Sequence, residues 1–145
     1  MALFKFTKAI LAGEPIQVFN YGEHWRDFTY IDDIVEGIMR VVDNPAKSNE
    51  KWVGHAPDPG TSFSPWRIYN IGNNKPIKLT DFISTLEINL GCKAKLIKLP
   101  LQLGDVEYTF ANIEELSAQF DYKPKTNISD GIRRFVSWYR TYFNN

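Results

Sequence analysis

Arg26 and Asp105 are the residues of this sequence whose setting best suits the binding of an anionic ligand. Arg26 follows the glycine-containing turn at residues 21–23, so its guanidinium can emerge from a rigid loop and contact a diphosphate through two hydrogen bonds. The alternative is a surface charge cluster with Glu23 or Asp27. Asp105 follows a glycine, a setting typical of turn formers, although its carboxylate could also accept both hydroxyls of a ribose. The residues alone leave both alternatives open.

Other chemistry finds little support in the sequence. No glycine-rich dinucleotide or triphosphate fingerprint follows a predicted strand, and no Tyr-x-x-x-Lys pair or serine elbow is present, so no catalytic residue is assigned. His24 and His55 lie in loop-like sequence without a ligand-spaced partner. We therefore expect surface or turn roles for both histidines, and no metal site.

Composition favours one ordinary folded domain. The 145 residues are 43% hydrophobic and 14% aromatic, enough for a core, and 17 basic residues balance 17 acidic ones. That balance argues against a nucleic-acid partner. Cys92 is the only cysteine, expected to be a semi-buried apolar residue and compatible with a cytoplasmic protein. Lys5 and Lys8 interrupt the first apolar stretch, so we expect no membrane segment.

Hydrophobic periodicity predicts two helices and a strand before a long loop. Apolar residues near one face predict a helix over residues 3–11, and a short strand follows at 16–18. Asp33 and Glu36 stand three residues apart, a spacing that predicts a capping box at the start of the second helix. Residues 44–66 carry four prolines and two glycines without periodicity, which indicates one long irregular loop. The apolar face expected for the second helix is Ile34, Ile38, Val41 and Val42.

The rest of the chain also alternates between strands and helices. We expect strands at 67–72 and 95–99, with a helix capped by Thr80 between them. Asn112 and Glu115 predict a second capping box. The pattern as a whole predicts a single α/β domain over residues 1–145, although the strands are few for a complete doubly wound domain. The last helix should bury the stripe Ile132, Phe135, Val136, Tyr139 and Phe143.

Three segments carry a family resemblance. These segments are RDFTYIDDIVEGI at residues 26–38, RIYNIGNNKPIKLTDFI at 67–83 and residues 101–140. All three are similar to the C-terminal, substrate-binding portion of the extended short-chain dehydrogenases/reductases. The stretches ALFKFTKAILAGEPI, VFNYG and PDPGTS are similar to those of the UDP-glucuronate 4-epimerases, the group within that superfamily that the chain most resembles. Asp121 stands where these enzymes have a glycine, so a left-handed conformation with some strain is expected there.

The resemblance implies a role for each candidate site residue. Arg26 would hold the pyrophosphate of a UDP-sugar, and Asp105 would accept the ribose hydroxyls. Main-chain groups of Gln17 and Phe19 would lie against the uracil. Gln102 stands where UDP-galactose epimerases place a second phosphate-binding arginine, a difference that fits the glucuronate group better.

The resemblance also implies an activity that this chain would not perform alone. The family oxidises a sugar hydroxyl with NAD, rotates the keto-sugar and returns the hydride to its other face. The N-terminal Rossmann half, with its glycine-rich loop and catalytic tyrosine and lysine, is expected to be missing here, so we expect no NAD bound to this chain. Exposed faces would then favour a homo-oligomer. Two alternatives are the same portion of a dehydratase, decarboxylase or reductase of this superfamily, and a non-catalytic binding or scaffold protein.

Overall fold

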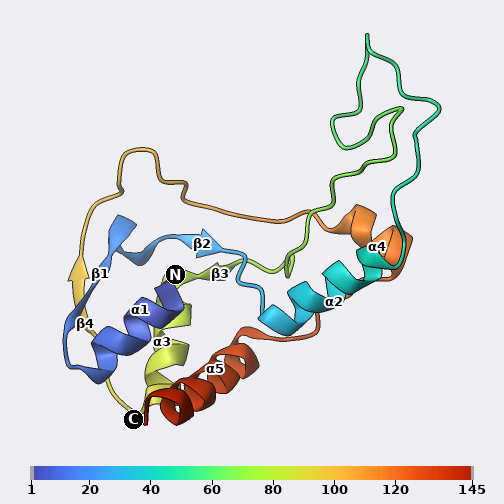
Figure 1. Cartoon of the computed structure of the whole chain (residues 1–145). Coiled ribbons are helices and arrows are strands. Elements are labelled where there is room, and N and C mark those ends of the chain that lie inside the picture. The colour runs from blue at the N-terminus through green and yellow to red at the C-terminus, as the bar shows by residue number, and fades with distance from the viewer. Residues whose placement is uncertain (1, 145) are drawn as a thin grey trace. The chain divides into compact units, whose positions relative to one another are not determined.

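The computed structural model describes residues 2–144 and divides into two compact units, each treated by itself below (Figure 1). Met1 and Asn145, the two ends of the expected domain, lie outside the described residues. The first unit comprises residues 2–28, 75–110 and 126–144, and the second comprises 29–74 and 111–125. The helices are α1 (Ala2–Leu11), the 3-10 helix η1 (Phe19–Gly22), α2 (Ile31–Val42), α3 (Leu79–Leu90), α4 (Glu114–Phe120) and α5 (Ile128–Phe143), and the strands are β1 (Pro15–Val18), β2 (Trp25–Arg26), β3 (Ile77–Lys78) and β4 (Lys95–Lys98).

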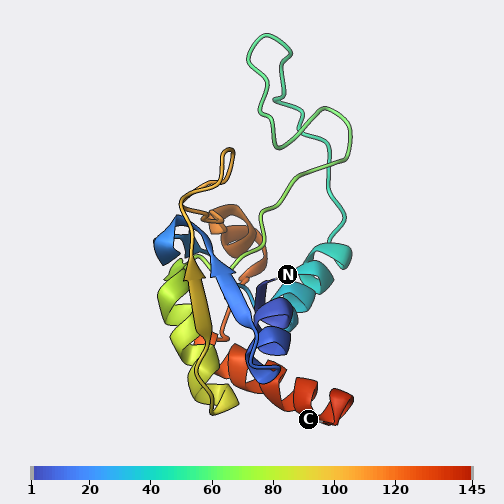
Figure 2. The ribbon, with the colours of Figure 1, turned by 90° about the vertical axis from the view of Figure 1, so that its left-hand side faces the viewer.

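The first unit is built around a pair of parallel strands. β1 pairs with β4, with Ile16 opposite Leu96 and Val18 opposite Lys98, and Figure 2 shows the two strands side by side. Parallel strands need a crossover connection, and α3 lies on the chain between them. A second, antiparallel pair joins β2 to β3. These pairings confirm the expected α/β class and the predicted strands at 16–18 and 95–99.

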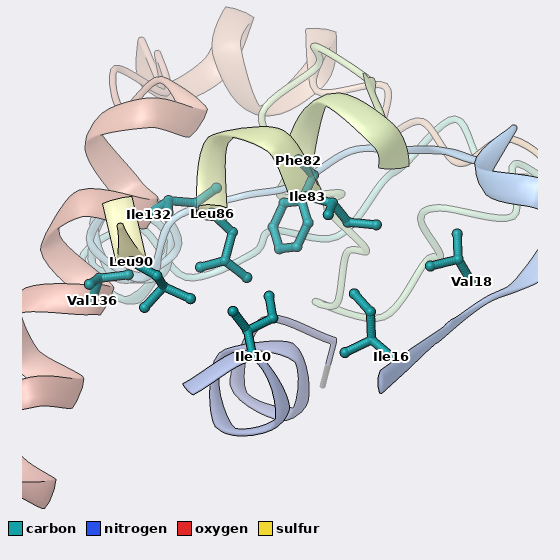
Figure 3. Packing of buried hydrophobic residues seen from close by; sticks show 9 residues of the cluster. All are labelled: Ile10, Ile16, Val18, Phe82, Ile83, Leu86, Leu90, Ile132 and Val136. Atoms are coloured by element: carbon teal, nitrogen blue, oxygen red, sulfur yellow. The ribbon is translucent and has the colours of Figure 1, made fainter. Parts of the chain in front are cut away.

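One apolar core holds the helices of this unit to β1. Ile16 and Val18 point inward from β1, whereas all four residues of β4 are exposed. Figure 3 shows Phe82, Leu86 and Leu90 of α3 facing Ile10 of α1. The predicted stripe of α5 is buried at Ile132, Val136 and Tyr139, while Phe143 remains 42% exposed.

The termini of α3 correct one expectation and confirm another. Thr80 was predicted to cap this helix, but α3 begins at Leu79, and its N-cap is Lys78, whose side chain makes no capping hydrogen bond. The antiparallel pairing of Lys78 with Trp25 brings β3 directly into the helix, so Thr80 already lies in the first turn. At the other end Gly91 adopts the left-handed conformation with φ 71°, as the sequence predicts.

The second unit packs α2 and α4 around Tyr122. The Tyr122 ring is fully buried and its hydroxyl donates to the carbonyl oxygen of Gly72 at 3.2 Å. A Cβ at Gly37 would lie 3.2 Å from both the Ile71 and Tyr122 side chains, so a glycine lets α2 approach them closely. Ile113 and Leu116 complete this smaller core.

The predicted start of α2 is wrong, and its predicted buried face is correct only in part, because Ile34 and Val41 are half-buried and Val41 packs against the core of this unit. The helix begins two residues before Asp33, which is buried in the first turn and accepts a hydrogen bond from the backbone N–H of Lys125 at 3.1 Å. Asp33 therefore ties residues 29–74 to the segment after α4 rather than capping α2. Ile38 and Val42, expected in the core, are 48% and 64% exposed.

Residues 67–72 do not form the predicted strand. A strand requires a hydrogen-bonded neighbour, and within residues 2–144 this segment makes only an isolated bridge between Thr61 and Arg67. Residues 44–66 contain no helix or ladder strand. The second capping box is also wrong, because Glu115 pairs with Arg67, although Asn112 Oδ1 does accept from the first N–H of α4 at 2.9 Å.

Two further expectations concern single residues. Asp121 ends α4 with φ 51°, which confirms the predicted left-handed conformation. Cys92 is partly buried, as expected. In the described part of the chain, no helix combines the length and apolar character needed to cross a membrane.

Candidate functional site

A turn with strained backbone torsion angles directly precedes β2, the strand that carries Arg26. Asn20 and Tyr21 have φ values of 48° and 51°, a left-handed conformation that is costly for residues with a Cβ. Gly22 follows with φ 92°, and a Cβ there would meet Thr80 Cγ2 at 2.8 Å. The Tyr21 N–H donates to the carbonyl oxygen of Leu99 at 2.9 Å, which fixes the turn to the end of β4. The turn thus sets where residues 24–26 begin.

Arg26 is held in place by acceptors on both sides of its guanidinium. Nη1 donates to the carbonyl oxygens of Trp25 at 3.0 Å and Glu107 at 3.2 Å, while Nη2 lies 3.1 Å from Asp105 Oδ1. Glu23, offered by the sequence as an alternative partner, pairs instead with Lys78 Nζ at 2.7 Å. The guanidinium is therefore preorganised beside a carboxylate from a distant part of the chain.

Asp105 forms a turn and also exposes part of its carboxylate. Its backbone N–H donates to the Gln102 carbonyl oxygen at 3.1 Å, which forms the expected turn. Its carboxylate Oδ1 accepts from the Val106 N–H at 2.9 Å and from Arg26, and Oδ2 lies 3.4 Å from His24 Nε2. The side chain is 35% exposed, so ligand hydroxyls can reach it.

A cavity of about 380 Å³ brings most of the candidate residues together. Arg26, Asp105, Gln17 and Phe19 all line it, although they come from β1, η1, β2 and the segment after β4. Gln102 is exposed and does not line this cavity. The other lining residues were not predicted as site residues; they are Ala2, Phe6, His24, Asp27, Phe28, Leu79 and Thr109.

His24 departs most from its expected position. A surface or turn role was predicted, but His24 is only 3% exposed, and its carbonyl oxygen accepts from the Leu79 N–H at 2.8 Å. The pairing of β2 with β3 explains this burial, because it draws the residue before Trp25 under the start of α3. No local sequence signal could have shown it, since β3 lies about fifty residues further along the chain.

A larger cavity, of about 570 Å³, lies within the second unit. Asn49, Asp58, Thr61 and Arg67 contribute to its lining, and none of the predicted site residues does. Asp58 Oδ2 accepts from the Thr61 hydroxyl at 2.7 Å and Oδ1 accepts from the Gly60 N–H at 2.9 Å; these bonds lower the pKa of Asp58. Four of the predicted site residues line the smaller cavity, so the smaller cavity is the better candidate site.

Comparison with known proteins supplies the family. Residues 1–72 match the NAD dependent epimerase/dehydratase family. Protein CapI of Staphylococcus aureus is 50% identical over 99% of this chain and 43% of its own length. UDP-glucuronate 4-epimerase 2 of Arabidopsis thaliana is 41% identical over 99% of this chain and 33% of its own length.

The fold agrees with the sequence matches. The crystal structure of UDP-glucuronic acid 4-epimerase from Bacillus cereus, in complex with UDP-glucuronic acid and NAD, superposes with a TM-score of 0.77 at 26% identity. The match covers 98% of this chain and 40% of the crystallised one. The present chain thus spans less than half the length of each of these three proteins.

The architecture is that of the short-chain dehydrogenase/reductase type of epimerase. The chain belongs to the NAD-dependent epimerase/dehydratase family, as its segments at 26–38 and 67–83 predict.

Proposed function

We propose that this chain supplies the sugar-nucleotide-binding part of an NAD-dependent epimerase that interconverts UDP-glucuronate and UDP-galacturonate. The observation that carries the proposal is the ion pair of Arg26 and Asp105 at the cavity shared with Gln17 and Phe19. The choice of sugar is supported by the names of relatives at 41–42% identity and by the UDP-glucuronic acid in the Bacillus cereus structure.

Arg26 would bind the diphosphate of this ligand. A planar guanidinium presents parallel N–H donors that suit two phosphate oxygens, and its present carbonyl partners fix its plane. The diphosphate would replace Asp105 as the anionic partner of Nη2. This exchange keeps Arg26 paired throughout, so binding does not leave a partly buried cation without a counter-charge.

Asp105 would then be free to accept ribose hydroxyls through Oδ1. The Val106 N–H, which already donates to that oxygen, holds the carboxylate at the turn. Gln17 and Phe19 would place main-chain groups of the β1 end beside the base. Gln102 would contribute little directly, since its carbonyl oxygen is engaged by the Asp105 N–H and its side chain lies away from the cavity lining.

The described residues do not fit NAD. A dinucleotide pyrophosphate is commonly held where a strand enters a helix through a glycine-rich turn. In residues 2–144, β3 enters α3 directly through Lys78 and Leu79, without such a turn. NAD supplies hydride transfer in this family, and we propose that this chain positions the sugar nucleotide without holding the cofactor.

Nuclear magnetic resonance of the chain titrated with UDP-glucuronate tests the proposal. Amide shifts should change at Gln17, Phe19 and Arg26, which line the first cavity. Asn49 and Thr61, which line the cavity of the second unit, serve as internal controls and should not move. Shifts confined to those control residues would contradict the proposed site.

A further inference from the structure

His24 has a buried imidazole nitrogen that makes no hydrogen bond. Its Nε2 lies 3.4 Å from Asp105 Oδ2, yet the two atoms do not form a hydrogen bond. Buried polar atoms nearly always have a partner, and the exceptions often mark a functional position. The unpartnered nitrogen faces the carboxylate of Asp105 and belongs to a side chain that lines the first cavity.

The two carboxylate oxygens of Asp105 face different groups. Oδ1 accepts from Arg26 Nη2 and from the Val106 N–H, whereas Oδ2 faces the Nε2 of His24. If the Arg26 guanidinium binds a diphosphate instead, the Asp105 carboxylate retains only the hydrogen bond from the Val106 N–H. One hydrogen bond leaves a carboxylate free to rotate about its side-chain torsions.

We propose that His24 is the positioning residue of Asp105, and that its Nε2–H donates to Oδ2 when Arg26 leaves Oδ1 for a diphosphate. The inference rests on the proposed function and assigns His24 a part in ribose recognition. A small rotation of the carboxylate would turn the 3.4 Å approach into a hydrogen bond. Oδ1, held by Val106, then faces the ribose hydroxyls.

The backbone around His24 suits it to this task. Its carbonyl oxygen is fixed by the Leu79 N–H at 2.8 Å, and the N–H of the next residue, Trp25, donates to Glu107 at 2.8 Å. These bonds hold His24 directly before β2, the strand that carries Arg26. Arg26, Asp27 and Asp105 are the charged residues that line the cavity with it.

The experiment compares UDP with 2′,3′-dideoxy-UDP, which lacks the ribose hydroxyls, by calorimetric titration of the full chain. The unmodified chain should prefer UDP by about tenfold, the discrimination expected when a charged acceptor loses its hydrogen-bond partners. His24→Ala should reduce the preference to about twofold or less, with most of the loss in UDP affinity. His24→Gln, whose amide can donate near the Nε2 position, should restore most of it.

A matched control and a spectroscopic readout separate positioning from folding. Arg133→Ala changes an exposed residue of α5 that pairs with Asp130 and should keep the full preference. In ¹⁵N-labelled chain, UDP should move the His24 Nε2–H proton resonance downfield, and this movement should be absent in Asp105→Asn. The Gln variant keeps the test valid if His24→Ala fails to fold.

Each outcome decides between the two hypotheses. Absence of UDP binding, or equal affinity of the unmodified chain for both ligands, would overturn the proposed ribose role of Asp105 and this inference with it. A preference that survives in His24→Ala would overturn the inference alone and leave the proposed function intact.

Discussion

The Nη2 of Arg26 lies 3.1 Å from Oδ1 of Asp105, although the two residues are 79 positions apart in the sequence. The contact joins β2 to the segment after β4, and Nη1 strengthens the junction through the Glu107 carbonyl oxygen. The cation proposed to bind the diphosphate and the anion proposed to bind the adjacent ribose are therefore partners of each other. If Arg26 binds a diphosphate as proposed, binding exchanges one ion pair for another.

The turn before β2 should depend on the absence of a side chain at Gly22. Gly22→Ala should lower the free energy of unfolding by about 2 kcal/mol or more, because the positive φ disfavours any L-residue and the new Cβ meets Thr80 at 2.8 Å. Gly13→Ala is the matched control, with φ 68° and no heavy atom within 4 Å of the new Cβ. Urea denaturation should show a clearly smaller loss for Gly13→Ala; equal losses would mean that the Thr80 contact relaxes freely.

Glu87 should make stability depend on pH in the acidic range. Burial acts to raise its pKa, but hydrogen bonds from Lys93 Nζ at 2.7 Å and the Ala94 N–H at 2.9 Å outweigh it and hold the pKa below the ordinary 4.5. A carboxylate with a lowered folded-state pKa stabilises the fold above its unfolded-state value, and this stability is lost as pH falls through the folded-state pKa. Glu87→Gln should thus cost about 1 kcal/mol near neutral pH and less below pH 4.5.

Denaturant unfolding at a series of pH values checks this prediction. Glu50→Gln, a change at an exposed loop carboxylate, is the control and should show little cost at any pH. A cost of Glu87→Gln that stays constant from pH 7 to pH 3 would show that the carboxylate charge makes no difference to the fold.

The exposed face of α2 should drive self-association. Ile31, Val35, Ile38 and Val42 follow one face of the helix and are between 48% and 64% exposed. Contiguous apolar patches of this kind usually mark an interface. Light scattering should show an average mass that rises with protein concentration, and the double variant Ile38→Lys, Val42→Lys should have a lower average mass. The control Ile88→Lys, at an exposed site on α3, should leave the average mass unchanged. A monomer at every concentration would contradict the prediction.

The chain should not bind NAD. A dinucleotide pyrophosphate is usually bound at a glycine-rich turn between a strand and a helix. In the described residues, β3 runs into α3 without such a turn. Calorimetric titration at tens of micromolar chain should give no saturable signal with NAD under conditions where UDP is tested. A saturable isotherm at micromolar affinity would contradict this prediction.

Two features of the fold that depend on neighbouring residues in the sequence were predicted correctly. The glycine after α3 and the apolar spacing of α5 are read from neighbouring residues, and both are confirmed at Gly91, Ile132 and Val136. The helix starts were less predictable. Asp33 has the side chain of a capping residue, but its carboxylate accepts a hydrogen bond from the N–H of Lys125, far along the chain. Long-range hydrogen bonds of this kind leave no local pattern.

The candidate site was predicted in part. Arg26 and Asp105 were chosen from their settings and from family resemblance, and the structure places them together, while their ligand roles stay predictions. The burial of His24 was missed because it results from the pairing of Trp25 with Lys78. The segment 67–72 was predicted as a strand from its own apolar residues, but strand formation also requires a partner.

The measurement that tests the central claim most directly is UDP-glucuronate affinity in Arg26→Ala beside Arg133→Ala. Arg26 is proposed to contact the diphosphate, whereas Arg133 lies on the exposed side of α5 and pairs with Asp130. We expect Arg26→Ala to weaken binding by about tenfold or more, since a charge-assisted contact is worth about 1.5 to 3 kcal/mol. Arg133→Ala should bind as the unmodified chain does. Equal affinity of Arg26→Ala and the unmodified chain would contradict the assignment of this cavity to the sugar nucleotide.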